Sequence, residues 1–148
     1  MIGLEVSKRM AVVTEFINLS TQGDTDVIDI TPQISEKLRS LNIKNGIVTI
    51  NVCGSTAAVT TCEYESGLIQ DIKEIFEKFI PQGKRYHHDD TWHDGNGHAH
   101  LRSSLVGTSL TVPFKNKELI LGTWQQIIFI DFDNRRRQRK IALQFLGE

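Results

Sequence analysis

The feature that most constrains the fold of this chain is a series of short apolar runs, rich in Val, Ile and Thr, separated by turn-forming residues. Residues 10–19 (MAVVTEFINL) and 46–53 (GIVTINVC) are clear examples. Branching at Cβ restricts these side chains in a helix and suits them to a pleated surface, so the runs predict β-strands. Short turns between runs, such as TQGDT and GST, predict hairpins and mainly antiparallel sheets.

The whole set of runs predicts about eight strands. They are expected at residues 10–19, 27–30, 46–53, 56–64, 98–107, 109–114, 119–132 and 135–147. The first two, the third and fourth, and the last two are expected to pair as neighbours across their turns. The long run near the end contains Gly122, which is expected to bend it.

Two segments predict amphipathic helices instead. Residues 31–42 open with Thr31 as the N-cap and Pro32 at the first helical position, and apolar residues follow at helical spacing. Residues 67–80 (GLIQDIKEIFEKFI) carry an apolar stripe of the same period. Because no repeat or linker interrupts the chain, the sequence predicts one domain over residues 1–148, of the α+β class, with two helices beside mainly antiparallel sheets.

Composition excludes several classes of protein. With 17 basic and 18 acidic residues the net charge is -1, so nucleic acid is not expected as a partner. No run approaches the ~20 apolar residues of a membrane span, and residues 1–10 (MIGLEVSKRM) lack the apolar core of a signal peptide. Cys53 and Cys62 have no CxxC spacing. These observations predict a reduced, cytoplasmic protein with no membrane partner.

All five histidines lie in one segment, residues 87–104 (HHDDTWHDGNGHAHLRSS), which is expected to be irregular up to about residue 97. On the strand predicted next, alternate side chains share a face. That face carries His98, His100, Arg102 and Ser104. Imidazoles two residues apart on a strand are about 6.5–7 Å apart at Cα and can bind one ion. The candidates for a third ligand are His87, His88, Asp90, His93 and Asp94.

Three histidines that leave one coordination position open form the catalytic type of zinc site. Such an ion can polarise a substrate oxygen or lower the pKa of a bound water. Arg102 could hold a phosphate or carboxylate, and Asp90 and Asp94 could orient imidazoles or act as acid or base. The alternative is that the histidines occupy an ordinary solvated loop, since HxH alone is a weak signal.

A second charged segment, residues 135–140 (RRRQRK), holds five basic side chains. On a strand, Arg135, Arg137 and Arg139 share a face and could bind phosphate or RNA. The alternative is a solvated edge strand that charge protects from aggregation. The GSTA sequence at residues 54–57 offers hydroxyls to an anion, but a plain turn is the simpler explanation.

The chain resembles the YjbQ-like family over nearly its whole length. The resemblance includes the blocks STAAVTTCEYESGLIQD, NGHAHLRSSLVG and LGTWQ. This uncharacterised protein family is often labelled secondary thiamine-phosphate synthase. The resemblance implies an α+β fold built on antiparallel sheet, and a homotrimer with the site near subunit interfaces. Many members read HTTA where this chain reads GSTA, so a family histidine is absent at Gly54.

The resemblance also implies residue roles. The motif histidines fall on His88, His98 and His100, which are expected to hold a divalent metal, with zinc as the first choice. The motif Asn falls on Asn96 and the motif Gln on Gln125. The two motif hydroxyls fall on Thr56 and Ser104, and the RxR pair falls on Arg137 and Arg139. The residues expected to be catalytic are Asp90, Asn96, Arg102 and Ser104, and those expected to bind substrate or phosphate are Thr56, Gln125, Arg137 and Arg139.

The family label implies an activity that joins a pyrimidine pyrophosphate to a thiazole phosphate, which requires a polyanion site and stabilisation of the leaving pyrophosphate. The preferred hypothesis is therefore a metal-assisted enzyme that acts on a small phosphorylated substrate. One alternative is a non-catalytic trimer that binds a metal or a phosphorylated metabolite. Another is an RNA-associated protein that uses the basic last strand.

Overall fold

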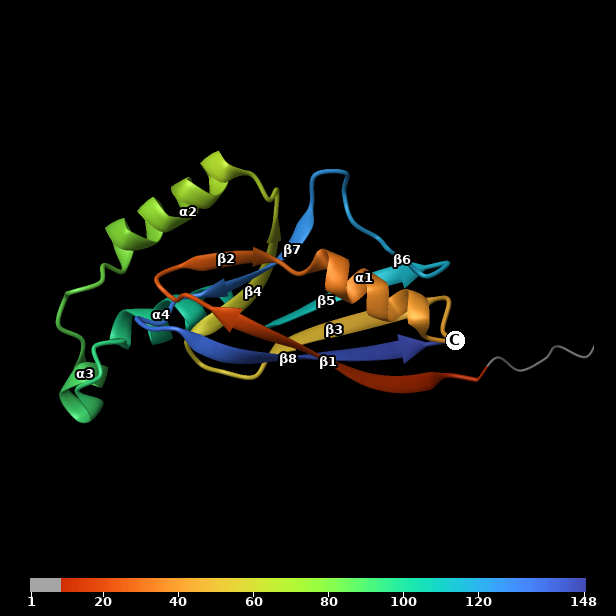
Figure 1. The fold of residues 1–148 in the computed structure, drawn as a ribbon, viewed down its shortest axis with the longest axis horizontal. Helices are drawn as coiled ribbons and strands as arrows, with labels where there is room; N and C mark the ends of the chain where they lie inside the picture. Colours follow the sequence, from red (N-terminus) through yellow and green to blue (C-terminus); the bar gives the residue numbers. More distant parts are fainter. Residues whose placement is uncertain (1–8) are drawn as a thin grey trace, which may run out of the picture.

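The computed structural model describes residues 9–148; residues 1–8, where no signal peptide is expected, lie outside the described part. The strands are β1 (Ala11–Thr21), β2 (Asp26–Asp29), β3 (Gly46–Val52), β4 (Ala57–Cys62), β5 (Ser109–Lys115), β6 (Glu118–Leu119), β7 (Gln126–Asp131) and β8 (Arg137–Gly147). The helices are α1 (Thr31–Ser40), α2 (Ser66–Phe79), α3 (His87–Trp92) and α4 (Gly97–Val106). Within this part of the chain the predicted α+β class with about eight strands is confirmed, and two additional helices are present (Figure 1).

The strands form two antiparallel sheets, ordered β1-β8-β3-β5-β6 and β2-β7-β4 (Figure 1). The predicted pairing of sequence neighbours is wrong in three places, because β1 and β2, β3 and β4, and β7 and β8 each lie in different sheets. Each of these turns carries the chain across from one sheet to the other. At the first crossing Gly23, Asp24 and Thr25 have φ angles of 79°, 53° and 63°, so three consecutive left-handed residues redirect the chain.

Two apolar layers hold the elements together. The larger layer fills the space between the sheets and under α1, and it contains Ile34, Phe129 and Leu143. The smaller layer lies on the other face of the three-stranded sheet, where Ile130 packs with Ala99 of α4 and with partly buried residues of α2. Strand β7 is therefore buried on both faces, which explains its unbroken apolar run.

The prediction of a strand at residues 98–107 is wrong, because this segment forms the helix α4. Ala99 and Ser103, one helical turn apart, are both buried, and Ser103 Oγ donates a hydrogen bond to the carbonyl oxygen of Ala57 (2.6 Å). Ala, Leu and Arg favour a helix more than a strand, and the alternation of polar and apolar residues obscured this preference. The preceding part, predicted to be irregular, contains α3.

The prediction of one long strand at residues 119–132 is also wrong, because a loop at residues 120–125 separates β6 from β7. Thr31, predicted as an N-cap, is the first residue of α1, and its Oγ1 accepts a hydrogen bond from the backbone N–H of Ile127 (2.8 Å). This bond ties α1 to β7. None of the helices within residues 9–148 is long and apolar enough to cross a membrane.

Candidate functional site

The connection between α3 and α4 is a tight reversal that depends on glycine. α3 ends at Trp92; its C-cap, His93, has a left-handed φ of 57°, and Gly95 follows with a φ of 67°. A Cβ on Gly97, the first residue of α4, would lie 2.6 Å from the Cβ of Tyr86. Glycine therefore lets the start of α4 approach the start of α3. The Gly97 N–H donates to Asp89 Oδ1 (3.0 Å), so a carboxylate satisfies one free donor at the helix terminus.

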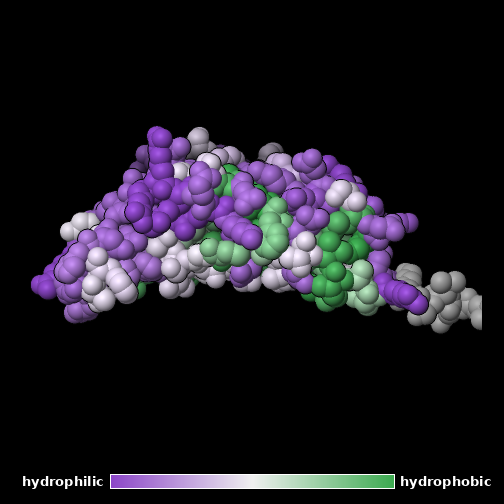
Figure 2. All heavy atoms as spheres, turned by 60° about the horizontal axis from the view of Figure 1, so that its bottom comes forward, coloured by the Kyte–Doolittle hydropathy of each residue, from purple (hydrophilic) through white to green (hydrophobic). Residues whose placement is uncertain are grey.

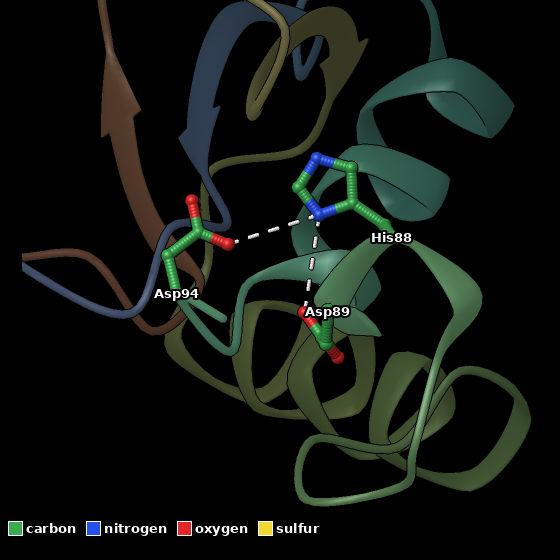
Figure 3. A group of neighbouring side chains, drawn as sticks. All are labelled: His88, Asp89 and Asp94. Carbon is green, nitrogen blue, oxygen red and sulfur yellow. Dashed lines mark ion pairs between the residues drawn. The ribbon is translucent and has the colours of Figure 1, made fainter. Parts of the chain in front are cut away.

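The reversal brings together His88, Asp89 and Asp94, which we call the acid–histidine cluster. His88 Nδ1 lies 3.9 Å from Asp89 Oδ1 and 3.8 Å from Asp94 Oδ1 (Figure 3). One potential ligand atom from each residue lies within 4.8 Å of the other two. In the described part of the chain, no other group of three His, Cys, Asp or Glu residues has this geometry.

The two histidines of α4 face different sides of the helix. Residues two apart on an α-helix project about 200° apart, so the predicted common row of His98, His100 and Arg102 is wrong. The His100 ring lies against the His88 ring, with centroids 4.1 Å apart and planes inclined by 38°, which places His100 beside the acid–histidine cluster. His98 is instead buried in the interior, with 1% of its surface exposed.

Both α4 imidazoles lie in environments that disfavour a positive charge. Burial is the main cause that lowers the pKa of His98, and the nearby Arg102 guanidinium lowers it further. Burial also lowers the pKa of His100, with a second contribution from His88. The neutral imidazole is the form that accepts a proton or coordinates a metal, and both environments favour that form.

Three buried side-chain atoms in this segment have no hydrogen-bond partner, namely His88 Nδ1, Asn96 Oδ1 and His98 Nε2. Among the described residues, Gln33 Oε1 is the one other buried atom in this state. Buried polar atoms are nearly always paired, and leaving one unpaired costs about 1–3 kcal/mol. Three such atoms within residues 88–98 mark this segment as one able to accept hydrogen bonds or to coordinate an ion.

Behind Asn96 lies a buried network that sequence reasoning missed. Its centre is the pair Asp131 and Asp133, both 0% exposed. Arg139 donates from Nε and Nη2 to the two Asp131 oxygens (2.7 and 2.8 Å), and Arg137 Nε donates to Asp133 Oδ2 (2.8 Å). Asn96 Nδ2 lies 3.4 Å from Asp133 Oδ1 and donates to it. The sequence did hold a signal for this network, because Asp131 and Asp133 stand two positions apart at the end of an apolar run and the basic segment at residues 135–140 follows.

The network is electrically balanced, with two carboxylates facing two guanidinium groups. Burial acts to raise the pKa of Asp133, but hydrogen bonds from Thr56, the Asn134 backbone and Arg137 outweigh it and hold this pKa below its usual value. Thr56 Oγ1 donates to Asp133 Oδ2 (2.9 Å) and accepts from Arg139 Nη2 (2.7 Å). Three of the residues predicted to bind phosphate, Thr56, Arg137 and Arg139, thus come together here.

Arg102, predicted to be catalytic, is 3% exposed and is enclosed by partners. Its Nε and Nη2 donate to the carbonyl oxygen of Ile80 (3.0 and 2.7 Å), and its Nη1 donates to Thr25 Oγ1 (3.1 Å). Its Nη2 also donates to Glu77 Oε2 (3.0 Å). These contacts fasten α4 to the end of α2 and to the crossing between β1 and β2.

The other predicted site residues are dispersed. Asp90 is exposed and pairs with Arg85 (2.8 Å), and Ser104 Oγ donates to a carbonyl of its own helix. Gln125 Nε2 donates to Thr61 Oγ1 (3.0 Å), in the loop between β6 and β7. That loop lies far from α3 in Figure 1, so the fold of the chain does not bring Gln125 to the acid–histidine cluster.

Comparison with known proteins gives a consistent match over most of the chain. The family model described as "UPF0047 protein YjbQ-like" matches residues 15–148. A UPF0047 protein of Archaeoglobus fulgidus is 40% identical over 126 residues, which cover 85% of this chain and 96% of the relative. UPF0047 protein YugU of Bacillus subtilis is 34% identical over 132 residues, covering 88% of this chain and 97% of that protein.

Solved structures show the same similarity in three dimensions. A "YbjQ-like protein of unknown function" from Sulfolobus solfataricus superposes with a TM-score of 0.88 at 35% identity, over 95% of this chain and 100% of that one. An uncharacterised protein of the yjbq/upf0047 family from Clostridium acetobutylicum gives a TM-score of 0.80 at 31% identity, over 88% and 98% of the two chains.

Proposed function

From the premise that the chain belongs to the YjbQ-like UPF0047 family, we propose that it is a metal-assisted enzyme acting on a small phosphorylated substrate. The descriptions of the relatives above name no reaction, so the proposal depends on the site. The observation that carries it is the acid–histidine cluster, in which the buried, unpaired Nδ1 of His88 lies near two carboxylates.

The donor set of the cluster suits a divalent ion such as zinc. Imidazole nitrogen and carboxylate oxygen bind zinc at about 2.0–2.2 Å, so two ligand atoms of a tetrahedral site are about 3.3–3.6 Å apart. The distances from His88 Nδ1 to Asp89 and Asp94 are 3.9 and 3.8 Å, and small side-chain rotations would close this difference. A cation would also relieve the repulsion between the two carboxylates.

The neighbouring groups supply further parts of the proposed site. A bound ion would supply Lewis-acid chemistry, which polarises a phosphate oxygen. His100, which lies against His88, offers a neutral imidazole that can move a proton. Asn96 is fixed through Asp133, and its unpaired Oδ1 can accept a hydrogen bond from substrate. Ser104 follows His100 by one helical turn and offers an exposed hydroxyl near it.

Zinc content tests the site directly. His88→Ala should reduce zinc from about one ion per chain to almost none, because the imidazole is the central ligand. The matched control is His87→Ala, since the His87 side chain is fully exposed one position earlier. Elemental analysis after zinc soaking and gel filtration measures both, and circular dichroism verifies folding. Equal zinc in the two variants, or none in the native protein, would refute the metal site.

Turnover separates the enzyme from the binding protein. The specific reaction implied by the family resemblance is transfer of a pyrimidine methylene group from its pyrophosphate to the ring nitrogen of a thiazole phosphate, with release of pyrophosphate. Pyrophosphate release by the zinc-loaded protein, lost in His88→Ala, would support the enzyme. Saturable uptake of phosphorylated ligands without product would instead support the non-catalytic alternative.

We also propose that the homotrimer implied by the family resemblance uses the outer face of the five-stranded sheet. Val12, Leu146 and Ile47 form one cross-strand row there, with 63%, 36% and 39% of their surfaces exposed. Figure 2 brings the underside of the molecule in Figure 1 forward and shows hydrophobic residues gathered among hydrophilic ones. An exposed apolar row of this kind is typical of an interface.

The mass in solution tests this interface. Ile47→Glu should convert a particle of three chains into single chains of 16.8 kDa, because a charge would be buried in the contact. Ile75→Glu on α2 is the matched control, since this side chain is 47% exposed away from the sheet. Light scattering after size exclusion gives the masses. A native protein of single chains, or an unaltered trimer in Ile47→Glu, would exclude this assembly.

A further inference from the structure

We propose that Arg135 and Arg136 form an anion-binding rim beside the acid–histidine cluster, and that their ligand is a phosphate or pyrophosphate group. This assignment rests on the proposed function and specifies which cations serve it. It transfers the role expected of Arg137 and Arg139 to their two neighbours on the turn between β7 and β8.

The first support is that carboxylates balance the charge of one pair of arginines and not that of the other. Arg137 and Arg139 face the buried carboxylates of Asp133 and Asp131, so their positive charge is already balanced inside the protein. Arg135 and Arg136 are exposed, and none of the ion pairs found within residues 9–148 includes them. Two uncompensated guanidinium groups therefore remain on this turn.

The second support is the position of the turn against the site. Asn134, directly before the arginines, donates from Nδ2 to the carbonyl oxygen of Asp94 (2.8 Å). Asn134 also faces Gly95, where an added Cβ would lie 3.5 Å from its Nδ2. The turn that carries Arg135 and Arg136 is thus bonded to the loop that supplies one arm of the acid–histidine cluster.

The turn is also held from its other side, which fixes the backbone that carries the two arginines. The backbone N–H of Asp24 donates to the carbonyl oxygen of Asp133 (2.7 Å). A Cβ on Gly23 would lie 2.7 Å from the carbonyl oxygen of Arg135, so the crossing between β1 and β2 packs closely on the turn. A fixed turn reduces the entropy lost when its side chains bind a ligand.

The third support is the balance of charge that the site requires if it is to bind an anion. The acid–histidine cluster alone carries two carboxylates and would repel a phosphate. A divalent ion would cancel these charges, and the two exposed arginines of the turn would then make the edge of the site positive. Guanidinium binds phosphate through paired, charge-assisted hydrogen bonds. A phosphate bridging the ion and the rim is therefore the ligand that this arrangement of charges fits.

Calorimetric titration with pyrophosphate tests the rim, using native protein both as purified and after zinc soaking. The double variant Arg135→Gln/Arg136→Gln should weaken binding by about tenfold or more, because charge-assisted hydrogen bonds are lost. The matched control is Arg9→Gln/Lys115→Gln, which removes the same charge at two exposed residues outside the site, one just before β1 and the other at the end of β5. Its affinity should change by less than about twofold, since long-range charge effects are screened.

Zinc content measured on the same samples separates this inference from the proposed metal site. Weaker pyrophosphate binding with unchanged zinc in Arg135→Gln/Arg136→Gln supports the rim. Equal losses of affinity in the two double variants would overturn it, because net charge would then explain the effect. Undiminished binding in Arg135→Gln/Arg136→Gln, or no pyrophosphate binding by the native protein, would also overturn it, whatever the zinc content.

Discussion

Asp133→Asn is expected to lower the free energy of unfolding by about 3 kcal/mol at pH 7, because it removes one partner of a buried charge pair. Asp133 is fully buried and accepts hydrogen bonds from Thr56, Arg137 and the Asn134 backbone. The amide keeps the shape of the side chain but leaves the Arg137 guanidinium without its carboxylate. Urea unfolding followed by circular dichroism measures the change.

The loss should depend on pH with a definite sign. The pKa of Asp133 is lower in the folded protein than in the unfolded chain, so its carboxylate stabilises the fold above the unfolded value of about 3.9. This stabilisation disappears as the pH falls through the folded pKa, and the native protein and Asp133→Asn should then converge. A gap between their stabilities that stays constant down to strongly acid pH would contradict the assigned role.

The control for Asp133→Asn is an ion pair on the surface. Glu15 Oε2 lies 3.5 Å from Lys37 Nζ, and both side chains are about one-third exposed, at 37% and 34%. Glu15→Gln should cost less than about 1 kcal/mol, because solvent screens such pairs. A similar cost for the two substitutions would indicate that burial of the Asp133 network contributes nothing.

Gly97→Ala is expected to destabilise the protein by about 1–3 kcal/mol and to weaken zinc binding at the proposed metal site by about 10–100-fold. The added Cβ would meet the Cβ of Tyr86 at 2.6 Å and Asp89 Oδ1 at 3.2 Å. Tyr86 immediately precedes α3, so relief of this clash must move α3 and His88 with it. Zinc titration with a competing chelator gives the affinity, and thermal unfolding gives the stability.

Gly122→Ala provides the comparison for Gly97→Ala. The nearest atom to a Cβ at Gly122 is the Cβ of Gln125 at 3.6 Å, which is an ordinary contact. This variant should keep the zinc affinity and most of the stability of the native protein. If Gly97→Ala retained native zinc affinity, the close approach of α4 to Tyr86 would have no part in shaping the acid–histidine cluster.

Local pattern predicted the strands and helices best where one period dominated. Residues 10–19 and 46–53 became β1 and β3, because their β-branched residues suit a pleat far better than a helix. The helix α4 was missed because HAHLRSS fits alternation as well as helical spacing, and tertiary packing of Ala99 and Ser103 on β4 decides between them. Sheet partners were missed because no local signal tells a hairpin turn from a crossing between sheets.

The location of the candidate site was predictable for a different reason. All the histidines are neighbours in sequence, so their concentration near residues 87–104 was visible without a structure. The grouping of these side chains in space was not, because the α3–α4 reversal brings Asp94 to His88 while α4 carries His98 into the interior. The support from Asp133 comes from the far end of the chain, and contacts so distant in sequence leave no local pattern.

The pairing of β1 with β8 also determines when the protein can acquire its site during synthesis. β8 is the neighbour of β1 in its sheet, with Thr21 opposite Arg137 and Ala11 opposite Gly147, so β1 has no sheet partner until residues 137–147 have been synthesised. The hydrogen bond from Asn96 to Asp133 likewise cannot form until Asp133 has been synthesised, and Asp133 gains its bond from Arg137 only later. Contacts that join distant parts of a chain form slowly, because closing a long loop costs entropy first. A chain that stops before β8 would therefore lack the strand that joins β1 to β3, and also the two arginines, Arg137 and Arg139, that balance the buried carboxylates behind Asn96.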